Sequence, residues 1–275
     1  MGRRDDDQAD YLVLATRRGL VKKTRLSEYN SNRSGGVIAI NLRQDEEGNY
    51  DELVSARLLS TGQDLLLVSR AGQSLRFHAD DDTLRPTGRA TSGVTGMRCR
   101  EDDYLLAMDV VDPSWQDADL FVVTEGGYAK RTNVVDYPVK GRGGLGVKVA
   151  NLVEARGNLV GALVTDSGDE VLCSVASGEV VRSAVVEVSR TGRTAQGVTF
   201  AKPDAGDRII AVARSTERDM EEAVDAADSA PSADSADSTD QAQALQAPEG
   251  DTGDSPAASA ADPVALEDNE SEVEA

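Results

Sequence analysis

The sequence predicts an all-β, propeller-like protein made of four repeats of about 50 residues, followed by a disordered acidic tail. Four apolar segments each lead into a glycine-containing turn and then into a second strand that carries basic residues. The turn glycines are Gly19, Gly72, Gly127 and Gly178, which are 53, 55 and 51 residues apart. No segment shows a sustained helical period, and strand-only repeats of this length are typical of propeller blades.

Each repeat is expected to contain four short strands. The first strands begin at Tyr11, Leu65, Leu120 and Val171, and the basic second strands follow the turn glycines. An arginine and several small residues then precede a valine-rich strand, in NRSGGVIAI, GRATSGVTGM, GRGGLGVKV and GRTAQGVTF. A last apolar strand closes the repeat, as in NLVGALVTD and RIIAVARS. The predicted blades are residues 10–62, 63–117, 118–168 and 169–216.

Both ends of the chain are expected to be disordered. Residues 1–9 are mostly polar and contain no apolar signal region. Residues 217–275 hold 18 of the 49 acidic residues but only one of the 29 basic residues, a net charge of −17. This composition cannot bury enough apolar surface to offset the entropy of ordering. The remaining body has a net charge of −3, so the total of −20 does not exclude nucleic acid as a ligand.

Residues 141–146, GRGGLG, match the G-x-G-x-x-G pattern of dinucleotide-binding turns. In those turns the glycines join a strand to a helix, and the helix N-terminus holds the pyrophosphate. Here Pro138 precedes the motif, and residues 147–152 alternate between apolar and polar as a half-buried strand does. We therefore expect no nicotinamide or flavin cofactor. The glycines are explained by a repeated loop that needs positive φ and close backbone approach.

Basic residues recur at two places in the repeats. The loop arginines Arg33, Arg89, Arg142 and Arg193 are 56, 53 and 51 residues apart. The second strands carry Lys22, Lys23, Arg76, Lys130, Arg131 and Arg182. Repetition is expected to place equivalent side chains on one rim of every blade, as a basic band. Because aromatic residues make up only 4% of the chain, such a band fits phosphate contacts better than base stacking. Solvated charges that prevent edge aggregation are the alternative.

Three segments carry a resemblance to a known family: LATRRGLVKKTRLSEYN, TEGGYAKRTNVVDYPVKGR and VSRTGRTAQGV. They resemble successive blades of the C-terminal domain of the DNA gyrase A protein, a β-pinwheel of propeller-like blades. The resemblance covers nearly all of residues 10–217, and it implies the last four blades plus the tail. The related domain of topoisomerase IV is the nearest alternative.

The family's Q-R-R-G-G-K-G box is matched most closely by residues 140–146, KGRGGLG. The match keeps one arginine and three glycines but lacks the glutamine, the other arginine and the internal lysine. The resemblance thus implies DNA contacts from Lys140, Arg142, Gly143, Gly144 and Lys148, in addition to the repeated loop arginines and strand cations. Arg142 is expected to matter most, because its flanking glycines let backbone amides approach phosphate.

The resemblance implies a DNA-binding and DNA-wrapping module that supports ATP-dependent negative supercoiling. The implied partners are duplex DNA, the rest of the gyrase A protein and the gyrase B ATPase in an A2B2 holoenzyme. We expect no catalytic residue, metal or cofactor on this chain, no membrane partner, and a cytoplasmic, chromosome-associated location. The acidic tail is expected to compete with DNA for the basic rim. A propeller-like protein-interaction scaffold is the alternative function.

Overall fold

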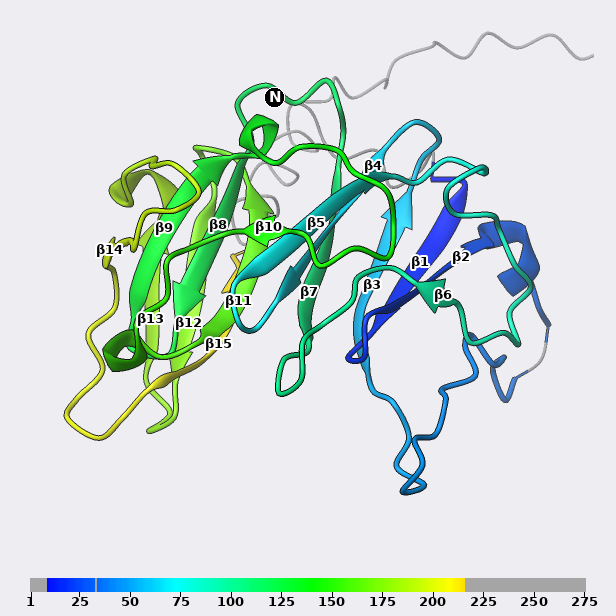
Figure 1. Ribbon diagram of the computed structural model, residues 1–275, viewed down its shortest axis with the longest axis horizontal. Helices are drawn as coiled ribbons and strands as arrows, with labels where there is room; N and C mark the ends of the chain where they lie inside the picture. Colours follow the sequence, from blue (N-terminus) through cyan, green and yellow to red (C-terminus); the bar gives the residue numbers. More distant parts are fainter. Residues whose placement is uncertain (1–8, 33, 216–275) are drawn as a thin grey trace, which may run out of the picture. The chain divides into compact units, whose positions relative to one another are not determined.

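The computed structural model describes residues 9–32 and 34–215 of the chain. The regular elements of these residues are β-strands and short 3-10 helices, without an α-helix. The four sheets can be followed in chain order by their labels and colours in Figure 1. The prediction of an all-β, propeller-like fold is therefore confirmed. The predicted tail of residues 217–275, most of the N-terminal segment and Arg33 lie outside the described residues.

The strands form four antiparallel sheets. The first has the order β3-β1-β2-β6, with β1 Tyr11–Thr16, β2 Leu20–Arg25, β3 Leu53–Leu59 and β6 Val94–Thr95. The second is β10-β5-β4-β7, with β4 Asp64–Ser69, β5 Gln73–His78, β7 Leu105–Val111 and β10 Val147–Lys148. The third is β11-β8-β9-β14, with β8 Asp119–Thr124, β9 Tyr128–Asn133, β11 Leu159–Thr165 and β14 Val198–Thr199. The fourth is β13-β12-β15, with β12 Glu170–Val175, β13 Val180–Ala184 and β15 Ile209–Arg214.

Short 3-10 helices follow the second strand in three repeats, and a fourth precedes β11. They are η2 Leu26–Tyr29, η3 Val134–Asp136, η4 Glu154–Arg156 and η5 Val185–Glu187.

The first two long strands of each repeat form a hairpin around the predicted turn glycine. Gly127 shows why this residue type is needed. Its φ is +76°, and an added Cβ would lie 1.7 Å from the carbonyl oxygen of Ala201 in the next repeat. A side chain here would therefore be strained in its backbone conformation and would also collide with the neighbouring repeat.

Three sheets are completed by a strand from the following repeat. The two-residue strand β6 pairs with β2, β10 with β5, and β14 with β9. The valine-rich segment of a repeat thus joins the sheet before it, whereas the sequence pattern had predicted it within its own repeat. In the fourth sheet β13 pairs only with β12 among the described residues.

The hydrophobic core consists of layers between neighbouring sheets. Leu65 and Leu67 of β4 pack in a cluster with residues of the first sheet, such as Val13. Leu66 and Val68 pack on the other face with residues of the third sheet, such as Leu120. Because successive side chains of a strand point to opposite faces, a strand between two layers needs an unbroken apolar run. A third cluster joins the third and fourth sheets in the same way.

Candidate nucleic-acid interface

The basic residues predicted on the second strands are mostly buried. Lys22 and Lys23 are 1% exposed and Lys130 is 2% exposed. Arg76 is 8% exposed, whereas the Arg131 side chain is 14% and the Arg182 side chain 45% exposed. The expectation of an exposed rim therefore differs from the structure for Lys22, Lys23, Lys130 and Arg76. Their charged ends donate to backbone carbonyl oxygens, and Lys23 and Arg76 also pair with the carboxylates of Asp81 and Asp64.

One basic position, the fourth after the turn glycine, recurs in all four sheets and meets an acid across the hairpin in three of them. Arg76 Nε lies 2.7 Å from Asp64 Oδ2, and Arg131 Nη1 lies 3.1 Å from Asp119 Oδ2. Arg182 Nε donates to Glu170 Oε2 over 2.8 Å. This pairing has a sequence signal that was not predicted, namely an acidic residue eight positions before the turn glycine.

In the first sheet Tyr11 occupies the place of the acid. The Lys23 ammonium lies 4.7 Å from the centre of its ring, a cation–π geometry. Lys23 Nζ also forms an ion pair with Asp81 Oδ1 at 2.8 Å. The cation at this position therefore finds a compensating group in every sheet.

In the first three sheets the same side chains reach a carbonyl oxygen that follows the second strand of the next repeat. Lys23 Nζ donates to the Ala79 oxygen over 2.6 Å, and Arg76 Nη1 to the Val134 oxygen over 3.0 Å. Arg131 Nε donates to the Val188 oxygen over 2.6 Å. These cations join neighbouring blades, and removing Arg76 or Arg131 would take away a partner of a buried acid.

The loop arginines occupy three equivalent positions at the outer edges of the first three sheets. We call residues 88–93, 141–146 and 192–197 the edge loops. The residue before each edge loop donates its backbone N–H to a carbonyl oxygen on the second strand of the sheet that the loop borders. These donors are Thr87 to Lys23, Lys140 to Arg76 and Thr191 to Arg131, over 2.8, 2.8 and 2.9 Å. Each edge loop then ends at β6, β10 or β14, so it arches over the outer strand.

The edge loop that matches G-x-G-x-x-G leads into the strand β10 and not into a helix. Gly146 has φ +81°, and an added Cβ would lie 2.0 Å from the Ser74 carbonyl oxygen. The motif therefore fits a loop packed on a sheet edge, as its sequence context predicted. Lys140 and Lys148, which flank this loop, are exposed, and Gly143 and Gly144 are half-buried within it.

The Arg142 guanidinium is exposed but is held by two carbonyl oxygens. Its Nε donates to the Thr83 oxygen over 2.9 Å, and its Nη1 to the Thr95 oxygen over 2.7 Å. Arg89 and Arg193, at the equivalent positions, are half-buried. Their guanidinium groups make no hydrogen bond and no ion pair with residues of the described ranges. These two arginines therefore keep more donors available for an anion than Arg142 does.

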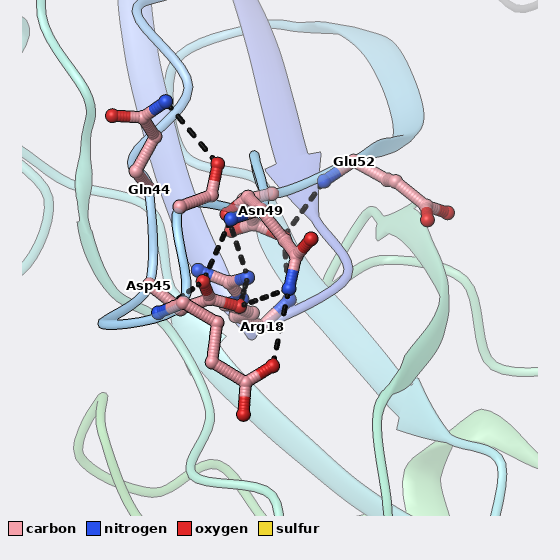
Figure 2. Close-up of polar contacts among 8 residues, drawn as sticks. Arg18, Gln44, Asp45, Asn49 and Glu52 are labelled. Atoms are coloured by element: carbon pink, nitrogen blue, oxygen red, sulfur yellow. Dashed lines mark hydrogen bonds and ion pairs between the residues drawn. The ribbon is translucent and has the colours of Figure 1, made fainter.

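Many other arginines are paired with carboxylates. Arg18 Nη2 lies 2.6 Å from Asp45 Oδ2 and also donates to the Asn49 carbonyl oxygen over 3.1 Å (Figure 2). Arg17 Nη1 lies 3.2 Å from Glu52 Oε2. The acidic hairpin around Asn49 thus neutralises the turn of the first sheet. Four further arginines have carboxylate partners: Arg57, Arg70, Arg190 and Arg214.

Two exposed arginines beside the edge loops were not predicted from the sequence. Arg43 Nη2 donates to the Gly93 carbonyl oxygen over 3.1 Å. The backbone N–H of Arg98 donates to the Gly144 carbonyl oxygen over 2.9 Å. Arg43 does not recur in the other repeats. The place of Arg98, nine residues after the loop arginine, is basic again only at Lys202, so it does not form a regular repeat. Several cations without a described carboxylate partner thus lie at and beside the edge loops.

Within residues 9–32 and 34–215, no three His, Cys, Asp or Glu side chains are grouped so that they could hold a metal ion. The helices of this part of the chain are too short and too polar to cross a membrane.

A family model described as the DNA gyrase C-terminal domain, a β-propeller, matches residues 10–60, 63–112, 118–166 and 177–216. The chain belongs to the DNA gyrase C-terminal domain family. It is 54% identical to the DNA gyrase A protein of Streptomyces coelicolor over 223 residues, which are 81% of this chain and 26% of that protein. It is 50% identical to the DNA gyrase A protein of Mycobacterium tuberculosis over 218 residues, 79% of this chain and 25% of that protein. The chain thus spans about a quarter of the length of these relatives.

Two solved structures of such domains have the same fold. A DNA gyrase A C-terminal domain superposes with a TM-score of 0.65 at 26% identity, covering 78% of this chain and 68% of that one. A DNA topoisomerase IV C-terminal domain gives a TM-score of 0.70 at 23% identity, covering 82% of this chain and 69% of that one. The fold is therefore common to both kinds of domain, while the Streptomyces and Mycobacterium relatives at 54% and 50% identity are gyrase A proteins.

Proposed function

We propose that this chain binds duplex DNA along the edge loops and serves as the DNA-wrapping part of a type IIA topoisomerase. In the holoenzyme it would act with the rest of the gyrase A protein and the gyrase B ATPase to support negative supercoiling. The chain itself contributes binding, while strand cleavage and ATP hydrolysis belong to other parts of the assembly. Membership of the gyrase C-terminal domain family supports this proposal.

One observation carries the proposal: an arginine stands at the same place in three successive edge loops. DNA offers a phosphate charge at regular intervals along each strand, and a repeated cation can follow it. The buried strand cations Lys22, Lys23, Arg76 and Lys130 are removed from the proposed contacts, because their donors already serve protein oxygens. Arg131 and Arg182, with carboxylate partners, are secondary candidates.

The proposed contacts are therefore Arg89, Arg193, Arg142, Lys140 and Lys148. The Gly144 backbone amide is the glycine candidate, because the Gly143 N–H already donates to the Gly96 oxygen over 2.7 Å. Arg142 ranks below Arg89 and Arg193, because two of its donors hold carbonyl oxygens. Arg33 stays a candidate from the sequence alone.

The experiment is a binding titration of the 275-residue chain with unrelated duplexes of equal length at several salt concentrations. Backbone contacts predict similar affinities for all sequences and a log–log salt slope of about −0.9 for each phosphate neutralised. A preference above roughly a hundredfold for one sequence would contradict backbone-dominated binding. Absence of binding at low salt would favour the alternative of a protein-interaction scaffold.

A further inference from the structure

The residue under each edge loop differs between the sheets. The third position after the turn glycine is Lys22 in the first sheet, Leu75 in the second and Lys130 in the third. In the hairpin register Lys22 lies opposite Leu14 and Lys130 opposite Val122, so both lysines share a face with core side chains. The buried Leu75 shows that an apolar side chain can occupy this position, so the repeat does not require a lysine there.

The two lysine ammonium groups bind the carbonyl oxygens of the edge loops. Lys130 Nζ donates to the oxygens of Gly192 and Arg193 over 2.7 and 2.6 Å, and to the Val149 oxygen over 2.6 Å. Lys22 Nζ donates to the carbonyl oxygen of Arg89 and to that of Ala39, the latter over 2.5 Å. An ammonium group has three donors, so Lys130 is fully satisfied by backbone oxygens.

We propose that Lys22 and Lys130 are positioning residues for DNA binding, each holding an edge loop from beneath so that its arginine faces an incoming phosphate. This inference rests on the proposed function. The two loops held in this way carry Arg89 and Arg193, whose guanidinium groups have no hydrogen-bonding partner in the described part of the chain. The loop over Leu75 lacks a lysine and is held by Arg142 itself, through the carbonyl oxygens of Thr83 and Thr95.

The electrostatics are consistent with lysines that hold the loops and arginines that face the phosphate. Burial, followed by the nearby Arg89 charge, lowers the pKa of Lys22 to about 8. Burial, followed by Arg193, also lowers the pKa of Lys130 to about 8. Each lysine is thus close to the arginine that its loop carries, and it adds a buried positive charge behind that arginine. A phosphate at the loop surface would offset the repulsion between the two cations.

A double-mutant cycle tests the proposal. Lys22→Leu introduces the residue found at the equivalent position of the second sheet, so the fold has a precedent for it. We expect Lys22→Leu to weaken duplex binding about five- to tenfold at 0.1 M salt and to reduce the salt slope by about one unit, the effect of one lost phosphate contact. In an Arg89→Ala background the same change should have little further effect, since the contact is already lost.

The cycle has distinct outcomes. If Lys22→Leu weakened duplex binding equally in the unmodified chain and in the Arg89→Ala variant, Lys22 would act independently of Arg89. That result would overturn the proposal. So would a variant with lowered unfolding temperature but unchanged affinity and salt slope, because its lysine would then be structural only. Absence of DNA binding by the unmodified chain would instead refute the proposed function before any variant is made.

The same double-mutant cycle can be carried out independently on Lys130 and Arg193. If Lys22→Leu fails to fold, Lys130→Leu with and without Arg193→Ala decides the question by the same criteria. Arg208→Ala is the matched control for net charge, since Arg208 is exposed and outside the edge loops. We expect this control to change the affinity for duplex DNA less than twofold. If it weakened binding as much as Lys22→Leu does, the effect of Lys22 would be a general loss of positive charge, which would overturn the proposal.

Discussion

Lys130 and Arg142 carry the same charge, but their surroundings give them different roles. Lys130 is 2% exposed and donates to three carbonyl oxygens, whereas Arg142 is exposed at the surface of its loop. The sequence showed that basic residues recur on the second strands but did not show their direction. That direction depends on partners distant in sequence, such as Gly192, whose carbonyl oxygen lies over the outer strand only after folding.

The burial of Lys130 predicts that the stability of the folded chain depends on pH. The pKa of Lys130 is about 8 in the folded chain and 10.5 in its ordinary environment. Below pH 8 both the folded and the unfolded chain hold the proton, and folding must bury a charge. Between pH 8 and 10.5 the folded chain has lost a proton that the unfolded chain keeps, so rising pH favours the folded state.

We therefore expect the unfolding free energy of the unmodified chain, relative to Lys130→Leu, to increase by roughly 1–2 kcal/mol between pH 7.5 and 9.5. Chemical denaturation of both proteins at the two pH values measures this difference, and the comparison cancels contributions from other titrating groups. The charged neighbours of Lys130 are Arg193, which lowers its pKa, and Asp136, which raises it. A difference that stays constant with pH would contradict a lowered lysine pKa.

At the scale of elements, the hairpins could be predicted from the sequence. The pairing of a short strand with the sheet of the preceding repeat could not. Turn glycines at regular spacing and apolar runs mark β1, β4, β8 and β12, since these features are local. The valine-rich segments that contain β6, β10 and β14 were expected as strands of their own repeats, but each forms only two residues of strand and pairs with the preceding sheet. Their partners are distant as well: Val147 pairs with Ser74, and only the folded chain brings these residues together.

The motif Gly141–Gly146 allows a matched test of this exchanged strand. Gly146→Ala should destabilise the fold by roughly 1–3 kcal/mol, because φ is +81° and the new Cβ would lie 2.0 Å from the Ser74 oxygen. Gly141→Ala is the control, since an added Cβ there meets no atom within 4 Å. Thermal unfolding of the two variants distinguishes them. Equal unfolding temperatures would contradict the tight packing of this loop on β5.

At the scale of the whole molecule, residues 1–216 carry a net charge of only −3. Paired and unpaired charges nevertheless lie in different places. Carboxylates pair with arginines on turns and strands, as Asp45 does with Arg18 and Asp64 with Arg76. The edge loops keep cations without a carboxylate partner among residues 9–32 and 34–215. Composition alone could not reveal this sorting, because it counts charges without their partners. Family membership and the repeated loop arginines were nevertheless accessible from the sequence.

The most direct test of the edge-loop interface is the salt dependence of DNA binding by the triple variant Arg89→Ala, Arg142→Ala, Arg193→Ala. The control is Arg18→Ala, which removes an arginine paired with Asp45. Loss of three phosphate contacts should make the log–log salt slope less steep by about three units and weaken binding steeply at low salt. The control should retain the slope and affinity of the unmodified chain. If the triple variant and the control have the same slope and affinity, the edge loops are not the DNA-binding surface.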